Sequence, residues 1–211
     1  ADAAALRALL PGTTTEIVRV LEELRALGLP HVSLVATMGT PVAELSDRVI
    51  DLSDFDEKSV VQTRFATTAL TVLRASVGES LDDVIAAGRQ IVAEDEGTAY
   101  RHLLGADQVT FLGDARTTPL AHEAALKLRE SAQFWAESYN AMEYRHGPIS
   151  IATTGRVVWA FGELPPALAE QIRATGAHLE HRDVDGQADL VRVHRFSIAA
   201  AQGRGLDPDM P

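Results

Sequence analysis

The chain has 211 residues, with 19 Lys and Arg against 30 Asp and Glu, and its formal net charge is −11. Because nucleic acids and anionic lipid surfaces attract positive charge, this balance argues against both as partners. The absence of cysteine excludes disulfides, thiolate metal sites and a cysteine nucleophile.

A small anionic ligand is compatible with this charge, because backbone N–H groups at a helix start and a few hydroxyls can bind a phosphate. No apolar stretch is long enough to span a bilayer, and no signal peptide is visible. We therefore expect a cytoplasmic protein. Only 5% of the residues are aromatic, and an apolar content made mostly of Ala, Leu and Val favours strands buried under helices.

The first part of the chain alternates helix and strand patterns. In chain order we expect a helix over 14–27, a strand over 31–37, a short helix over 41–46, a strand over 48–53 and a helix over 60–77. Residues 1–10 have a helical composition, although a lobe of this kind should begin with a strand. We therefore expect a fragment, or segments joined across a gap near Pro11.

A second set follows a connector. We expect a helical connector over 81–104 interrupted near Gly97, strands over 107–113 and 156–161, and helices over 119–130, 166–176 and 191–202. Strands separated by such helices predict an α/β protein with parallel sheets. The expected organisation is two similar three-layer α-β-α lobes. The first covers 1–95 with the connector helix and is incomplete at its start, and the second covers 96–211 and is truncated at its end.

The chemistry-bearing segment is 117–148. Thr118 is a good N-cap and Pro119 a good first helical residue, which would leave free N–H groups facing a cleft. Glu123, Lys127 and Glu130 fall on one helical face. By itself this face is more typical of a solvated Glu–Lys pair than of catalysis.

The loop that closes this segment ends in Gly-Pro and contains His146. Glu143 and His146 form a single Glu-x-x-His pair, and His122-Glu123 lacks the second histidine of a zinc-protease helix. These are weak signals for a metal site. We expect neither a metal nor a cofactor.

The run TTPLAHEAALKLRESAQFWAESYNAMEYRHGPISI resembles the second lobe of proteins of the sugar isomerase (SIS) family. It is similar to the isomerase half of glucosamine-6-phosphate synthase and to double-SIS proteins of the tagatose-6-phosphate isomerase and fructoselysine-phosphate deglycase types. GTTTEIV, GTPVAELSDRVIDL, EKSVVQTRFATTAL and GLDPDMP extend the resemblance over nearly the whole chain. Leu9-Leu10-Pro11 stand where the family has a Ser-x-Ser phosphate loop.

The resemblance implies roles for individual residues. Glu130 would be the base that moves a proton between adjacent sugar carbons, and His146 would assist ring opening, reaching a neighbouring subunit's site. Lys127 would orient Glu130 or bind a sugar oxygen. The phosphate and sugar would be bound by Gly12, Thr13, Thr14, Val60, Gln62 and Thr63. Simple helix capping at the threonines and a buried helix start at 60–63 are the competing interpretations.

The implied function is aldose–ketose isomerisation of a hexose-6-phosphate or amino-hexose-6-phosphate through an enediol-type intermediate. Deaminases and deglycases share the proton transfer, and the sequence does not separate them. The alternative is a regulatory SIS module that binds a sugar phosphate without turnover. In either case the resemblance implies a homodimer or a larger homo-oligomer.

Overall fold

The computed structural model describes residues 5–8 and 14–211. Contacts between Cα atoms divide the chain into two compact units, Ala1–Ser80 and Leu81–Pro211. Each unit contains its own parallel sheet. None of the helices formed by the described residues combines the length and hydropathy that crossing a membrane requires.

The first unit is built on the three-stranded parallel sheet β1-β2-β3. Its elements are β1 Ala5–Ala8, α1 Thr15–Ala26, β2 His31–Val35, α2 Pro41–Leu45, β3 Arg48–Asp51, the 3-10 turn η1 Ser53–Phe55 and α3 Arg64–Ser76. Neighbouring side chains of β2 point to opposite faces of the sheet. Leu34 packs with Phe65 of α3, whereas Val35 packs with Leu21 of α1. The sheet is therefore covered on both faces.

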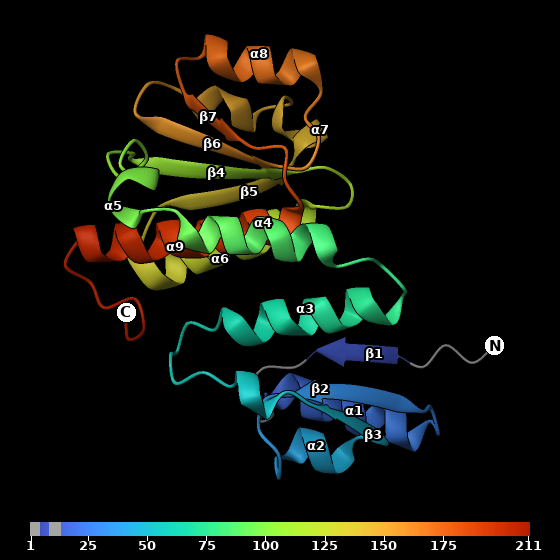
Figure 1. Ribbon diagram of the computed structural model, residues 1–211. Helices are drawn as coiled ribbons and strands as arrows, with labels where there is room; N and C mark the ends of the chain where they lie inside the picture. The colour runs from blue at the N-terminus through green and yellow to red at the C-terminus, as the bar shows by residue number, and fades with distance from the viewer. Residues whose placement is uncertain (1–4, 9–13) are drawn as a thin grey trace. The chain divides into compact units, whose positions relative to one another are not determined.

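The second unit is built on the four-stranded parallel sheet β5-β4-β6-β7. Its elements are α4 Asp82–Ala93, α5 Glu96–Ala99, β4 Gln108–Gly113, α6 Thr118–Ala132, β5 Ala136–Asn140, α7 Ala141–Tyr144, η2 Pro148–Ile151, β6 Arg156–Phe161, α8 Pro166–Ala174, β7 His178–His181 and α9 Gly186–Gly203. Helices α6 and α9 cover one face of this sheet, and α7 and α8 lie on the other (Figure 1).

The central strands of this sheet are buried from both sides. All six residues of β4 are buried. Phe111 and Trp159 pack toward α6 and α9, and Leu112 and Val158 pack toward α8. This near-continuous apolar burial is typical of a parallel sheet between two helical layers, and it confirms the predicted α/β class.

One local prediction needs correction, and two strands were not predicted. Residues 1–10 were expected to be helical, but Ala5–Ala8 form strand β1, paired in parallel with β2. Sheet pairing outweighs the high helix propensity of alanine there, and the strand that such a lobe needs is present. The strands β5 and β7 were not predicted, because their polar residues hide the strand pattern.

The connector also differs from expectation. It consists of α4 and the single-turn α5, separated near Glu94, rather than one helix interrupted near Gly97. Helix α4 packs on α9 through Val84, Ile91 and Ala188. It therefore groups with the second unit, whereas the sequence assigned it to the first lobe.

Candidate functional site

The carboxyl end of β4 leads into α6 through a tight turn. Gly113 lies so close to the helix start that a Cβ there would be 2.3 Å from the Thr118 backbone nitrogen. Thr117 is the N-cap residue, one position earlier than expected, and the helix begins at Thr118 with Pro119 in its first turn. The turn brings strand end and helix start together at the edge where parallel α/β sheets bind ligands.

Backbone N–H groups of this turn, just before the helix start, are bonded within the chain. Oδ1 of Asp114 accepts hydrogen bonds from the backbone N–H groups of Arg116 and Thr117 at 2.8 and 2.9 Å. Its other oxygen accepts from the backbone N–H of Glu163 at 3.3 Å. Burial raises the pKa of Asp114, but these donors outweigh burial and hold the pKa below its usual value. A carboxylate of the chain itself therefore occupies the place where an anion would bind.

A hollow of about 360 Å³ lies beside this turn. It is lined by Asp114, Ala115, Asn140, Ala141, Met142, Glu163, Leu164, Pro165 and Pro166. Asn140 is held in place by two hydrogen bonds: its amide donates to the Thr118 hydroxyl at 3.1 Å, and its Oδ1 accepts from the Met142 N–H at 2.9 Å. The hollow thus offers polar groups that are already engaged with one another.

Farther along α6, one face of the helix carries a different arrangement. Lys127 is buried, and its Nζ lies 2.6 Å from Oε2 of Glu130 and 3.6 Å from Oε1 of Glu123. The spacings of three and four residues place these groups on one face of the helix, as the sequence predicts. Glu130 keeps 38% of its side chain exposed, and Glu123 keeps 30%. One ammonium group is therefore shared by two carboxylates that solvent or a ligand can reach.

Glu123 was not among the predicted site residues, although the sequence placed it on the same face. Burial raises the pKa of Glu123, the charge of Lys127 lowers it, the charge of Glu130 raises it, and the net shift is upward. A carboxyl group that holds its proton more readily than usual thus lies beside the proposed base. The signal in the sequence was its position four residues before Lys127.

His146 is exposed and follows α7, where its backbone N–H donates to Glu143 at 3.0 Å. The structure does not bring it next to Glu130 within the second unit. Glu130 lies two residues before the end of α6, near the start of β5, while His146 lies beyond the carboxyl end of that strand. The five residues of β5 alone separate the two positions by about 13 Å.

The predicted phosphate- and sugar-binding residues belong to the first unit. Gly12 and Thr13 lie outside the described residues. Thr14 is the half-buried N-cap residue of α1, and its carbonyl accepts from the N–H groups of Ile17 and Val18 at 3.0 and 3.1 Å. This position follows the carboxyl end of β1, where a phosphate-binding helix start is found in such folds.

The other three predicted contacts surround the start of α3. Val60 is 70% exposed. Thr63 is the N-cap residue, and its hydroxyl donates to Glu57 at 3.1 Å. The carboxylate of Glu57 also accepts from the Phe65 N–H at 2.9 Å. Oε1 of Gln62 is buried and accepts no hydrogen bond from any residue that the structure describes. This acceptor is available to a sugar hydroxyl.

These two sheet-based units have the fold of SIS phosphosugar isomerases, and the predicted resemblance to the SIS family is confirmed. No family model matches the chain. A glutamine–fructose-6-phosphate aminotransferase (isomerizing) of Sulfurisphaera tokodaii is 28% identical over 95% of the chain, which spans 39% of that relative. The corresponding enzyme of Sulfolobus acidocaldarius is 26% identical, and the chain spans 40% of it.

Solved structures agree on the fold. The C-terminal domain of glucosamine-fructose-6-phosphate aminotransferase from Francisella tularensis matches with a TM-score of 0.84 over 100% of this chain and 76% of that one, at 18% identity. Glucosamine-6-phosphate deaminase from Thermotoga maritima matches with a TM-score of 0.76 over 99% of this chain and 72% of that one, at 20% identity. At these identities the structural likeness concerns the fold alone.

Proposed function

We propose that this chain catalyses proton transfer on a hexose-6-phosphate or amino-hexose-6-phosphate, as an aldose–ketose isomerase or as a deaminase or deglycase. The observation that carries the proposal is the face of α6 on which Lys127 binds Glu130 and Glu123. The curated relatives are isomerizing aminotransferases of fructose-6-phosphate, and the chain spans about 40% of their length. Both facts fit a sugar-phosphate site.

Glu130 acts as the base in this proposal. Its carboxylate takes a proton from one sugar carbon and returns it to the adjacent carbon. A second proton moves from the hydroxyl oxygen to the former carbonyl oxygen, so that an enediol forms between the two steps. A base must be accessible to the substrate and held in one orientation. Glu130 is partly exposed, and the 2.6 Å contact with the buried Lys127 fixes its carboxylate. Lys127 is thus a positioning residue.

The remaining predicted residues bind the substrate in this proposal. Gly12, Thr13 and Thr14 hold the phosphate at the start of α1, and Val60, Gln62 and Thr63 face the sugar. The buried Gln62 Oε1 supports this placement, because an acceptor without a partner is costly unless a ligand supplies the donor. His146 assists ring opening, and its distance from Glu130 supports a site shared between two copies of the chain.

The decisive experiment is Glu130→Gln in the full-length protein. Loss of a general base lowers the rate by about 100- to 10,000-fold, so we expect kcat for isomerisation or deamination of hexose-6-phosphates to fall by that factor. Glu170→Gln is the matched control, because Glu170 is an exposed carboxylate on α8, and it should leave kcat unchanged.

A thermal-shift measurement with the same sugar phosphates separates catalysis from binding, because a ligand of the native state raises Tm. If Glu130→Gln turns over substrate at the wild-type rate, the assignment of Glu130 as the base is wrong. Ligand binding without any turnover by the wild-type protein would instead identify a regulatory sugar-phosphate module.

A further inference from the structure

A second cluster of side chains that can bind a metal lies at the β7 edge of the sheet in the second unit. It consists of His102, from the segment between α5 and β4, and of His178 and Glu180 from the edge strand β7. The ligand atoms of all three lie within 4.8 Å of one another. None of these residues belongs to the sugar-phosphate site proposed above.

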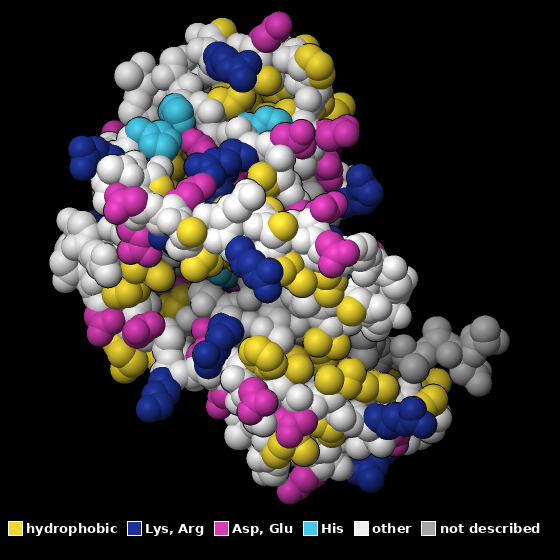
Figure 2. Space-filling model, in the orientation of Figure 1, with side chains coloured by type: hydrophobic (Ala, Val, Ile, Leu, Met, Phe, Trp, Pro, Cys, Tyr) yellow, Lys and Arg dark blue, Asp and Glu magenta, His cyan; other side chains and the backbone are white. Residues whose placement is uncertain are grey.

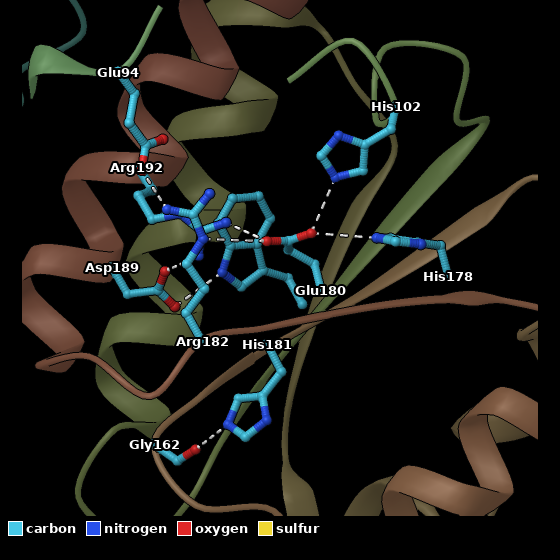
Figure 3. A network of polar contacts seen from close by, with 10 residues as sticks. Glu94, His102, Gly162, His178, Glu180, His181, Arg182, Asp189 and Arg192 are labelled. Atoms are coloured by element: carbon cyan, nitrogen blue, oxygen red, sulfur yellow. Dashed lines mark hydrogen bonds and ion pairs between the residues drawn. The ribbon is translucent and has the colours of Figure 1, made fainter. Parts of the chain in front are cut away.

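Figure 3 shows how the cluster is arranged. The carboxylate of Glu180 lies between the two imidazoles on one side and the guanidinium of Arg192 on the other. Its Oε2 is 3.1 Å from Nε2 of His102 and 3.2 Å from Nε2 of His178. Its Oε1 is bound by Arg192. One oxygen is therefore held by the buried arginine while the other faces both histidines.

The three atoms that converge on this point are all electron-pair donors when the imidazoles are neutral with the proton on Nδ1. Such an arrangement requires a positive centre between them, which is either protons on the Nε2 atoms or a metal ion. Two ligands of a tetrahedral Zn²⁺ lie about 3.4 Å apart, given metal–ligand distances near 2.1 Å. The observed histidine–carboxylate separations are close to this value.

The local charges also favour a cation. The Glu180 carboxylate keeps only 11% of its side chain exposed and forms an ion pair with the buried guanidinium of Arg192. Arg192 is also paired with Asp189, at 2.6 Å, and Arg182 is paired with Glu94. The carboxyl groups of this network therefore outnumber its guanidinium groups by one. The carboxyl groups belong to Glu94, Glu180 and Asp189, and the guanidinium groups to Arg182 and Arg192.

The histidines are accessible and adjustable. His102 and His178 keep 46% and 48% of their side chains exposed, so their rings can rotate onto an ion that arrives from solvent. Figure 2 shows histidine side chains exposed on this face of the second unit, among acidic and basic groups. The buried carboxylate forms the fixed wall of the site, and the two exposed rings close it.

We propose that His102, His178 and Glu180 bind a divalent transition-metal ion of the Zn²⁺ class. Two imidazoles and one carboxylate form a donor set suited to Zn²⁺ and its first-row neighbours, and water completes the coordination. The ion ties the segment before β4 to the edge strand β7. Its function is to clamp this edge of the second unit, independently of the proton-transfer site on α6.

The test is a Zn²⁺ titration of the chelator-treated full-length protein by calorimetry, comparing wild type with the double variant His102→Ala/His178→Ala. We expect the wild type to bind one ion that the double variant does not bind. Each single substitution should weaken binding by more than tenfold, because even outer-shell partners of a metal are worth about 10- to 100-fold. In the thermal-shift assay, Zn²⁺ should raise Tm of the wild type only.

Two further variants keep the result interpretable. His181→Ala is the matched control, because His181 lies on the same strand with its Nε2 directed at the Gly162 carbonyl, 2.8 Å away (Figure 3), and this variant should bind Zn²⁺ normally. His178→Gln keeps a donor for Glu180 but removes the imidazole, so it should retain stability in chelator and lose Zn²⁺. Identical titrations of wild type and double variant, or no Zn²⁺ uptake by the wild type, would overturn the proposal.

Discussion

Carboxylates at the start of helix α6 and along its body are in opposite situations. The helix has 15 residues and is therefore about 22 Å long. At its amino end, backbone N–H groups bind Asp114 and hold its pKa low although burial raises it. Farther along the helix, at Glu123, burial and the charge of Glu130 raise the pKa more than Lys127 lowers it. The first carboxylate is fixed as part of the backbone turn, while the second retains the capacity to exchange a proton.

This difference in pKa indicates which carboxylates of this region can exchange a proton. A carboxylate surrounded by N–H donors is a poor base, because the donors stabilise its charged form. Glu123 and Glu130 share the single buried ammonium group of Lys127, and both side chains are partly exposed. A helix start after a strand is the usual anion site in these folds, but in the second unit Asp114 already fills it.

Among the variants that test this comparison, the largest effect is expected from Lys127→Met. Without the ammonium group, Glu130 is no longer held, and misplacement by about 1 Å can cost 100-fold in rate. We therefore expect kcat to fall by about 100-fold with little change in KM, as measured by steady-state kinetics. A rise in KM with unchanged kcat would show that Lys127 binds a sugar oxygen instead of orienting the base.

A smaller effect, on stability alone, is expected from Asp114→Ala. The substitution removes the acceptor of the Arg116 and Thr117 N–H groups, and loss of a hydrogen bond to a charged group costs about 1.5–3 kcal/mol. Urea unfolding should record this loss while kcat stays near wild type. A large fall in kcat with unchanged stability would place the amino end of α6 in the catalytic site and reverse the comparison.

The smallest effect concerns pH. Because the pKa of Asp114 is lowered in the folded state, its contribution to stability is present above its usual pKa and is lost as pH falls through the folded value. The raised pKa of Glu123 acts in the other direction, so its protonated form contributes at low pH and the contribution is lost as pH rises through the folded value. Unfolding free energies measured from pH 3 to 7 should therefore respond oppositely to Asp114→Asn and Glu123→Gln. Parallel changes would contradict the contrast.

Much of the fold could be predicted from the sequence, because its central strands are apolar and its helices end at recognisable signals. Strand β6 has the predicted bounds, 156–161, and α6 extends beyond the predicted 119–130 by only one or two residues at each end. Strands β5 and β7 could not be predicted in the same way, because they carry Glu, Asn and His where a parallel strand usually carries Val or Ile.

The candidate site was predictable in one respect and not in another. Helical spacing placed Glu123, Lys127 and Glu130 together, and the structure shows their contacts. Asp114 also accepts a hydrogen bond from the N–H of Glu163, which is 49 residues away in the chain. Such a contact leaves no local signal except the Asp114 to Thr117 spacing of a side-chain turn. The roles of Glu130 and His146 remain predictions that the proposed kinetics test.

The placement of Glu130 and His146 at opposite ends of β5 has a genetic consequence. If each catalytic site takes its base from one copy of the chain and its histidine from another, then two inactive proteins can repair each other. Mixed oligomers of Glu130→Gln and His146→Ala would contain some sites with neither lesion, and activity would return on co-expression. A site built within a single copy would stay inactive in every mixture, so complementation between alleles reports how the catalytic residues are distributed among subunits.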